Sequence, residues 1–199
     1  MEVEVKLQLP DATAHQKLSA LLSPFHKKTH LQENAFFDGP NQELSSRRLV
    51  LRLRFYDNDT HCVISLKGKS VIVDGIARAE EEEEEFDPSL GRACLGEPWR
   101  LTRSNSQLVQ RIVDEFALSD FVYLGGFRNV RAVHEWDGLV LEVDETRFGF
   151  GTSYEVECET AEPERAREML EGLLKENAVP YTYSTVSKFA VFRSGKLPE

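Results

Sequence analysis

The chain has 199 residues, 41% of them hydrophobic, and a formal net charge of −10. This length suits a single domain over residues 1–199, and this hydrophobic content is sufficient for a core. The acidic balance excludes nucleic acid as a general partner, which needs a basic surface, although a local group of arginines and lysines can still bind a small anion.

No apolar run approaches the length of a membrane span, and a charged residue stands at the second position. We therefore expect neither a signal peptide nor a transmembrane helix, and no membrane partner. Three cysteines, Cys62, Cys94 and Cys158, are widely spaced and form no metal-ligand or redox motif. We expect them to be reduced thiols in a cytoplasmic protein.

The first segment, Met1–Lys6, alternates charged and apolar residues. Successive side chains of a strand point to opposite faces, so Glu2, Glu4 and Lys6 would share one face. Neighbouring carboxylates repel unless a cation lies between them, and carboxylate oxygens are preferred ligands of Mg²⁺ and Mn²⁺. A solvated edge strand would show the same alternation, so this segment alone leaves both interpretations open.

A helix, a turn and two basic strands follow. Asp11 is placed to cap a helix that runs to about Leu22, and residues 38–41 predict a turn. The charged pairs Arg52 and Arg54, and Lys67 and Lys69, accompany apolar runs that are typical of strands. The Asp-Asn-Asp segment at residues 57–59 predicts the hairpin loop between these two strands.

An acidic run follows at Glu80–Glu85, two residues after Arg78. Both phases of a strand would be charged here, so hydrophobicity does not fix which side chains point inward. We favour the phase of Arg78, in which Glu80 and Glu82 point inward, whereas a bulge would bring in Glu81 instead. A solvated tract is the alternative interpretation of such a run.

The second half of the chain adds helices and acidic strands. Residues 87–105 contain two prolines and two glycines and indicate an irregular excursion, after which a helix is expected from about Ser106 to Phe116. The acidic strands carry Glu142 and Asp144, and Glu155, Glu157 and Glu159, at alternate positions. Thr160 can cap a further helix.

Charge is sorted by strand along this sequence. An ordinary sandwich explains any one alternation, because a strand buries its apolar phase and exposes its polar phase. It does not explain why the polar phase is almost entirely ionised, or why some strands are acidic and others basic. A closed barrel with an ionised lumen explains both, with acidic walls for metal ions, basic walls for an anion, and helices over its outward apolar phase.

Several of these short motifs follow one another in a recognisable order. They are Glu2-x-Glu4-x-Lys6, Leu51–Arg54, Ser65–Lys67, Arg78–Glu80, Val130–Arg131, Glu142–Asp144, Glu155–Glu157 and Lys188–Phe189. The order resembles that of the CYTH superfamily, the triphosphate tunnel metalloenzymes, whose ExExK motif the first of them matches. Asn129 departs from the pattern, because many bacterial members carry a lysine there, and Arg128 could compensate only in an irregular strand.

The resemblance implies an α+β, mainly β fold, in which a closed eight-stranded antiparallel barrel forms a tunnel with a charged lumen and helices pack on the outside. It implies a small anionic triphosphate as substrate and Mg²⁺ or Mn²⁺ as cofactor. The C-terminal segment is similar to that of small plant members, which resemble inorganic triphosphatases. We therefore expect hydrolysis of tripolyphosphate to pyrophosphate and phosphate by a monomer, since a closed barrel has no free sheet edge.

The site residues follow from the sorted charge and the resemblance together. The expected metal ligands are Glu2, Glu4, Asp144, Glu155 and Glu157. Substrate binding is assigned to Lys6, Arg52, Arg54, Lys67, Lys69, Arg78, Arg131 and Lys188. Catalytic roles are assigned to Glu2, Glu4, Lys6 and Lys188, and a further acidic wall to Glu80, Glu81, Glu82 and Glu142. Lys6 could contact phosphate or pair with the glutamates, and the sequence leaves this open.

The sequence contains no Ser–His or Cys–His nucleophile set, so direct attack by water is preferred. Two alternatives stay open. The substrate could be thiamine triphosphate or a nucleoside triphosphate, with Trp99, Trp136 and Tyr154 as aromatic candidates for its organic part. Alternatively, the protein could bind polyphosphate without hydrolysing it. A plain ligand carrier is disfavoured, because its lumen would be apolar.

Overall fold

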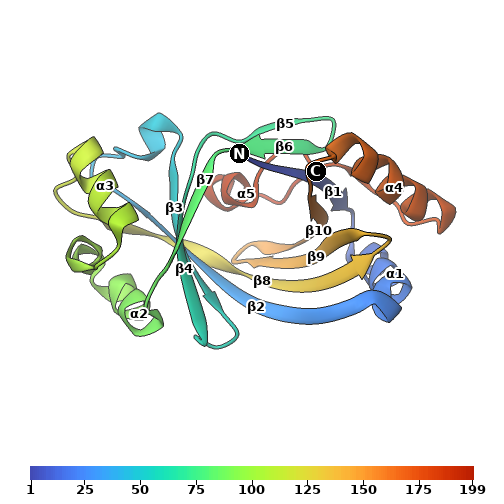
Figure 1. The fold of residues 1–199 in the computed structure, drawn as a ribbon, viewed down its shortest axis with the longest axis horizontal. Coiled ribbons are helices and arrows are strands. Elements are labelled where there is room, and N and C mark those ends of the chain that lie inside the picture. The colour runs from blue at the N-terminus through green and yellow to red at the C-terminus, as the bar shows by residue number, and fades with distance from the viewer. The chain divides into compact units, whose positions relative to one another are not determined.

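A computed structural model describes all residues, 1–199, and shows an α+β protein built mainly of antiparallel strands (Figure 1). The chain forms two compact units, each with its own hydrophobic core. The first unit comprises Met1–His30, Ser70–Ala79 and Arg128–Glu199, and the second comprises Leu31–Lys69 and Glu80–Phe127. The expected single domain stays a prediction.

The strands are β1 (Glu2–Leu9), β2 (His26–Asp38), β3 (Val50–Tyr56), β4 (His61–Lys67), β5 (Val71–Val73), β6 (Ile76–Ala79), β7 (Glu81–Glu85), β8 (Val122–Trp136), β9 (Leu139–Phe148), β10 (Gly151–Glu159) and β11 (Thr182–Tyr183). Their hydrogen-bonded order is β5-β6-β1-β10-β9-β8-β2-β3-β4-β7, with β11 on β1. Eleven strands replace the expected eight, and hydrogen bonds do not close the sheet. One cause of the higher number of strands is the acidic run. The strand is interrupted at Glu80, so that β6 before it pairs with β1 and β7 after it pairs with β4.

The helices are α1 (Ala12–Leu22), α2 (Pro88–Gly96), α3 (Gln107–Phe116), α4 (Pro163–Glu176) and α5 (Lys188–Ser194), with short 3₁₀ helices η1 (Ser23–Phe25), η2 (Ser45–Arg47) and η3 (Pro98–Arg103). The predicted cap of α1 is confirmed, because Asp11 accepts a hydrogen bond from a backbone N–H of the first turn. Ser106, where the helix α3 was expected to begin, caps that helix in the same way. The Thr160 cap is wrong. α4 starts at Pro163, and the Thr160 hydroxyl instead accepts from the N–H of Glu162 at 3.0 Å.

In the first unit, β1, which is dark blue in Figure 1, lies between β6 and β10. Its apolar phase is buried, and helices α1 and α4 supply the facing side chains. Val5 and Leu7 of β1, Leu18 of α1 and Leu170 of α4 belong to one core cluster and are fully buried. The apolar phase of these strands is thus covered by helices, as the alternation predicts.

In the second unit, β2, β3, β4 and β7 form the sheet, and α2, η3 and α3 cover its apolar phase. The prediction of an irregular stretch at residues 87–105 is wrong, because this stretch forms α2 and η3. Pro88 is compatible with the first turn of a helix. Gly91 reads as a breaker, but a Cβ there would lie only 2.9 Å from the Phe55 ring, so glycine lets the helix approach the sheet.

Three further expectations concern the hairpin loop, the cysteines and membrane-spanning helices. The β3–β4 hairpin turns through Asp57, Asn58 and Asp59, all three left-handed, with φ of 50°, 58° and 65°. The three cysteines are buried and form no disulfide. None of the helices has both the length and the apolar character needed to cross a membrane.

Candidate active site

The first unit carries a charged face that begins on β1. The two-residue period places Glu2, Glu4 and Lys6 on one face of this strand, while Val5 on the other face lies in the core. In the register of β1 and β10, Lys6 lies opposite Glu157. Opposite residues of an antiparallel pair point to the same side, so these two side chains meet.

The charged face continues across β9 and β8. Asp144 lies opposite Glu155 of β10 and opposite Arg131 of β8, and Glu142 lies opposite Glu157. These residues are far apart in the sequence, but the antiparallel register of four neighbouring strands brings them together. The sorted acidic strands therefore share one face, on which Asp144, Glu155 and Glu157 are buried.

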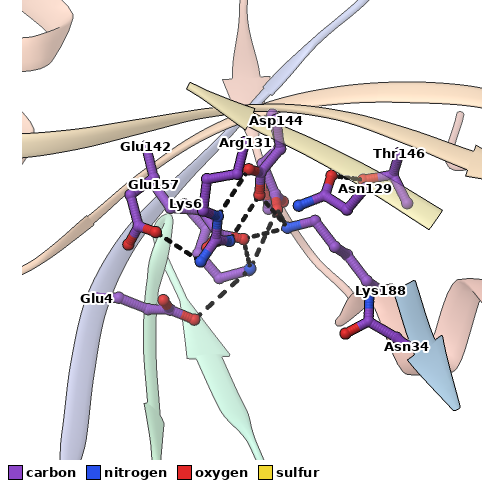
Figure 2. A network of polar contacts seen from close by, with 12 residues as sticks. Glu4, Lys6, Asn34, Asn129, Arg131, Glu142, Asp144, Thr146, Glu157 and Lys188 are labelled. Carbon is purple, nitrogen blue, oxygen red and sulfur yellow. Dashed lines mark hydrogen bonds and ion pairs between the residues drawn. The ribbon is translucent and has the colours of Figure 1, made fainter. Parts of the chain in front are cut away.

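Lys6 lies among glutamates (Figure 2). Its Nζ atom is 2.5 Å from Oε1 of Glu157, 3.1 Å from Oε1 of Glu155 and 3.6 Å from Oε1 of Glu4. Glu157 is also bonded by Lys188. Lys6 therefore pairs with carboxylates in this structure, and its contact with phosphate stays a prediction.

Lys188 approaches the same carboxylates from helix α5. It is the first residue of that helix, and Ser187 caps the helix by accepting a hydrogen bond from the N–H of Ala190 at 3.1 Å. The Nζ atom of Lys188 lies 2.7 Å from Oε1 of Glu155 and 2.9 Å from Oδ2 of Asp144. The cap therefore fixes the backbone from which this ammonium group is presented.

Arg131 binds three carboxylates through all three of its guanidinium nitrogens. Nε and Nη2 donate to the two oxygens of Asp144 at 2.8 and 2.7 Å, a bidentate pair. Nη2 also lies 2.8 Å from Glu157, and Nη1 lies 2.6 Å from Glu142. Arg131 thus holds the acidic residues in place, and its expected part in substrate binding stays a prediction.

These groups shift one another's pKa. Burial alone lowers the pKa of Lys6, but the neighbouring glutamates outweigh it and hold the pKa well above its ordinary value. Burial alone raises the pKa of Glu157, but three surrounding cationic groups outweigh it and hold the pKa well below its ordinary value. For Glu155 burial prevails, and the pKa is raised. Among the buried glutamates of this cluster, the surroundings thus raise the pKa of Glu155 and lower that of Glu157.

Asp144, Glu155 and Glu157 fit the expected divalent cation. Each offers one carboxylate oxygen, and these oxygens lie within 4.8 Å of one another. The connected cluster contains five carboxylates and three cationic side chains, a formal charge of −2 that one divalent ion would neutralise. Hard oxygen donors suit Mg²⁺ or Mn²⁺. Glu2 and Glu4, also expected as ligands, lie outside this group of three.

Ser184 belongs to the cluster although the sequence gave no reason to select it. Its hydroxyl donates to Oε2 of Glu155 at 2.5 Å, and its backbone N–H donates to the carbonyl of Lys6 at 3.1 Å. The residue follows β11, a two-residue strand whose pairing with β1 brings it to this place. A strand of two residues shows no alternation in the sequence, so nothing there indicated that Ser184 would lie at the site.

The second unit carries the predicted basic residues on the charged face of β3 and β4. Nη2 of Arg52 lies 3.2 Å from Oε1 of Glu81, and Nζ of Lys67 lies 3.7 Å from Oε2 of the same residue. Nε of Arg54 donates to Oδ1 of Asn34 at 2.7 Å. Burial, followed by repulsion from Arg54, lowers the pKa of Arg52 to about 10.

The acidic run takes the register that we did not favour. Glu81 lies opposite Lys67 and is 8% exposed, whereas Glu82 is 62% exposed and pairs with Arg111 of α3. Glu80 lies between β6 and β7 and is exposed. The inward prediction for Glu82 is therefore wrong, because the break at Glu80 shifts the phase by one residue, as the bulge alternative anticipates.

Two other predicted anion-binding residues are placed elsewhere. Arg78 lies opposite Val3, on the helix-covered face, and its Nη2 is 3.6 Å from Glu164 of α4. The inward orientation of Arg78 was inferred from a single strand that continues into the glutamates. The interruption at Glu80 removes this continuity. Lys69 is exposed and lies beyond the end of β4. The structure thus brings neither residue to the charged faces.

Asn129, the departure from the family pattern, is buried on the same face as Arg131. Its Oδ1 accepts a hydrogen bond from the Thr146 hydroxyl at 2.9 Å (Figure 2). Pairing of β8 with β9 is unbroken from Arg128 onward, so Arg128 points to the opposite face and is exposed. It does not supply the missing basic group.

Comparisons with known proteins agree with this arrangement. Residues 1–192 match the CYTH domain. A solved structure from Hippeastrum, described as the putative adenylyl cyclase HpAC1 with a dominant triphosphatase activity, is 54% identical, with coverage of 100% of this chain and 98% of that one and a TM-score of 0.96. No curated protein matches the sequence.

More distant structures share the fold. A putative adenylate cyclase from Bacillus halodurans is 20% identical, with coverage of 96% of this chain and 97% of that one and a TM-score of 0.73. The PH1819 protein from Pyrococcus horikoshii is 18% identical, with 97% and 99% coverage and a TM-score of 0.63. Since the family match extends over nearly the whole sequence and a relative of the same length is more than half identical, the resemblance is confirmed and the chain belongs to the CYTH domain family.

Proposed function

We propose that this protein is a divalent-metal-dependent triphosphatase that hydrolyses inorganic tripolyphosphate. The buried group of Asp144, Glu155 and Glu157, in contact with Lys6 and Lys188, carries the proposal. Hydrolysis of a polyanion needs both cation-binding oxygens and positive side chains. The described activity of the Hippeastrum relative supports the same class of reaction here.

The reaction joins a water oxygen to a terminal phosphorus and breaks the bridging P–O bond, which leaves phosphate and pyrophosphate. Asp144, Glu155 and Glu157 would hold a cation that, when bound, neutralises phosphate charge and lowers the pKa of water. Lys6 and Lys188 keep their positive charge at neutral pH, because nearby carboxylates outweigh burial and raise their pKa. Their ammonium groups would bind phosphate oxygens and the leaving pyrophosphate.

Arg52 and Arg54 keep their proposed part in substrate binding. Arg52 and Arg54 present planar guanidinium groups, which bind phosphate oxygens through two parallel hydrogen bonds. Glu2 and Glu4 keep their proposed part in metal binding and catalysis, and Lys67 in substrate binding. The closed tunnel implied by the family resemblance, a monomeric state and a cytoplasmic location also stay part of this proposal.

A phosphate-release screen tests the proposal. Tripolyphosphate, ATP and thiamine triphosphate would each be incubated with Mg²⁺, with Mn²⁺ and with a chelator. We expect tripolyphosphate with metal to react fastest and the chelator to stop release. Faster release from ATP or thiamine triphosphate would favour an organic substrate. Binding of tripolyphosphate without release in any arm would instead favour the non-catalytic module.

A further inference from the structure

The charged face of the second unit contains two buried donors that have no hydrogen-bond partner. Four buried side-chain polar atoms in the protein lack a partner, and two of these are Nδ2 of Asn34 and Nε of Arg52. Buried donors in native proteins are nearly always paired. Two unpaired donors on one face therefore indicate a surface that is made to receive an acceptor.

The register places these donors side by side on neighbouring strands. Asn34 of β2 lies opposite Arg54 of β3, and Arg52 lies two positions from Arg54 on the same face. Asn34 is only 1% exposed, so its amide is not an ordinary solvated group. A polar residue this deeply buried requires compensation for the water that its donor has lost.

The orientation of the Asn34 amide follows from chemistry. Nε of Arg54 donates a hydrogen bond to the amide oxygen of Asn34, Oδ1, at 2.7 Å. A guanidinium nitrogen can only donate, so the amide oxygen must face Arg54. The NH₂ end of Asn34 consequently points away from Arg54, with its donors unused.

The proximity of two arginines on this face also favours an anion. The face carries Arg52, Arg54 and Lys67 together with Glu81, Glu83 and Glu85. The ion pairs of Arg52 to Glu81 and Glu83 measure 3.2 and 3.8 Å. Its Nε stays unpaired. Crowding of the two arginines would be relieved by a negative ligand.

We propose that Asn34 is an anion-binding residue of this protein: its Nδ2 donates to an oxygen of the phosphate chain, while its Oδ1 holds Arg54 with both terminal nitrogens directed at the same anion. This inference rests on the proposed function and adds a neutral donor to its substrate-binding set. The uncharged amide supplies a hydrogen bond without attracting the carboxylates that occupy cationic side chains elsewhere.

A double-mutant cycle tests whether Asn34 contacts the anion itself. Asn34→Leu, Arg54→Ala and the double variant would be compared with the wild type by calorimetric titration with tripolyphosphate in the presence of chelator. A lost hydrogen bond to a charged group weakens binding by roughly tenfold or more. We expect Asn34→Leu to raise Kd by about tenfold, and still by about threefold in the Arg54→Ala background. A loss that disappears in that background would overturn the contact and leave a positioning role alone.

Asn34→Asp provides a second, isosteric variant. Its carboxylate can still accept from Arg54, but it replaces the donor with a negative charge facing the anion. We expect an increase in Kd larger than that of Asn34→Leu, and a KM effect greater than any kcat effect. Wild-type affinity in Asn34→Asp would overturn the proposal. Thermal unfolding of each variant checks that it is folded.

Glu33→Gln is the matched control. Glu33 is the neighbour of Asn34 on β2, but it pairs with Arg92 at 2.7 Å on the opposite face. The control removes an ion pair from the same strand, and tripolyphosphate affinity should not change. A wild-type protein that binds tripolyphosphate but releases no phosphate would refute the proposed function while these binding constants still decide the role of Asn34. Absence of binding by the wild type would refute both.

Discussion

At the scale of single residues, Glu157 shows how strongly one side chain depends on its neighbours. It is 4% exposed and contacts Lys6, Arg131 and Lys188. These cations keep it ionised in spite of its burial. A buried carboxylate with three cationic partners keeps a fixed negative charge. This charge can bind a metal ion, and it stabilises the buried cationic side chains around it.

Glu157→Gln should nearly abolish metal-dependent activity. The amide fills the same volume but removes the charge, and loss of such an electrostatic interaction costs on the order of 10²–10⁴ in rate. The measurement is kcat/KM for tripolyphosphate with saturating Mg²⁺. Glu164→Gln, which removes the exposed partner of Arg78, is the control and should retain full activity. Activity in Glu157→Gln close to that of the wild type would contradict the metal assignment.

Asp144→Asn should remove the stabilisation of the protein by Mg²⁺. A ligand that binds only the folded state stabilises it by about 2.7 kcal/mol at a concentration one hundred times its Kd. We expect the Tm of the wild type to rise with added Mg²⁺ and to fall again with chelator. In Asp144→Asn the Tm should not respond to Mg²⁺. An equal rise in both proteins would place the ion elsewhere.

Many ionised residues of the charged faces could be selected from the sequence, whereas the neutral ones could not. Period-two alternation identified Lys6, Asp144 and Glu157, because an ionised polar phase is unusual enough to stand out. Asn34 and Ser184 were not selected, since the sequence does not distinguish a buried amide or hydroxyl from one on a solvent-exposed strand or loop. Such residues become visible only when burial and partners are known.

At the scale of elements, helix α5 links a local capping interaction to the charged cluster. Lys188 is its first residue, and Ser187 holds the first turn. α5 has only seven residues, and short helices depend strongly on their ends. The position of the Lys188 ammonium is therefore sensitive to one hydroxyl.

Ser187→Ala should lower kcat/KM much more than Ser106→Ala does, while the two variants lose similar free energy of unfolding. Loss of an N-cap costs about 1 kcal/mol, and here the loosened turn carries Lys188. Ser106→Ala is the matched control, because Ser106 caps α3 through an equal 3.1 Å hydrogen bond but presents no site residue. Steady-state kinetics and urea unfolding of both variants provide the comparison. Equal effects on kcat/KM would contradict this role of the cap.

Elements with a sequence-local signal were predicted, and those decided by tertiary contacts were not. Asp11 and Ser106 cap helices that the sequence indicates. α2 was missed, because Gly91 resembles a loop residue until the nearby Phe55 ring is seen. The register of the glutamate run was also misjudged, since only the exchange of partner strand at Glu80 decides it.

At the scale of the whole molecule, the sorted charge and the family could be recognised, but the number of strands could not. Short strands such as β5 and β11 have two or three residues and form because a neighbour offers free backbone groups. No periodic pattern can exist over so few positions. Motif order is a property of the whole sequence and is far more specific than any one segment.

Global stability should decline in mild acid because of His134. Burial lowers the pKa of this histidine below its ordinary value of 6.5, and its Nε2 has no hydrogen-bond partner. The unfolded chain therefore binds the proton first. The stabilisation is complete above about pH 6.5 and is lost as the pH falls through the lower folded-state pKa.

The free energy of unfolding in urea at about pH 7.5 and about pH 5.5 measures this effect. His134→Asn cannot titrate there, and its amide can still donate to the carbonyl of Leu22, the present partner of Nδ1. We expect a smaller decline with acid in the variant than in the wild type. Parallel declines in the two proteins would assign the acid sensitivity to other groups.

Lys6, Arg131 and Lys188 of the first unit neutralise part of the carboxylate charge that a bound metal ion would otherwise neutralise. Because they offset three of the five carboxylate charges of this cluster, we expect the polypeptide to fold before it binds magnesium. An incoming ion has to compete with tethered ammonium groups, so its retention should be loose and its exchange rapid. Such a protein would lose activity quickly when magnesium is depleted and regain it on resupply, without having to fold again.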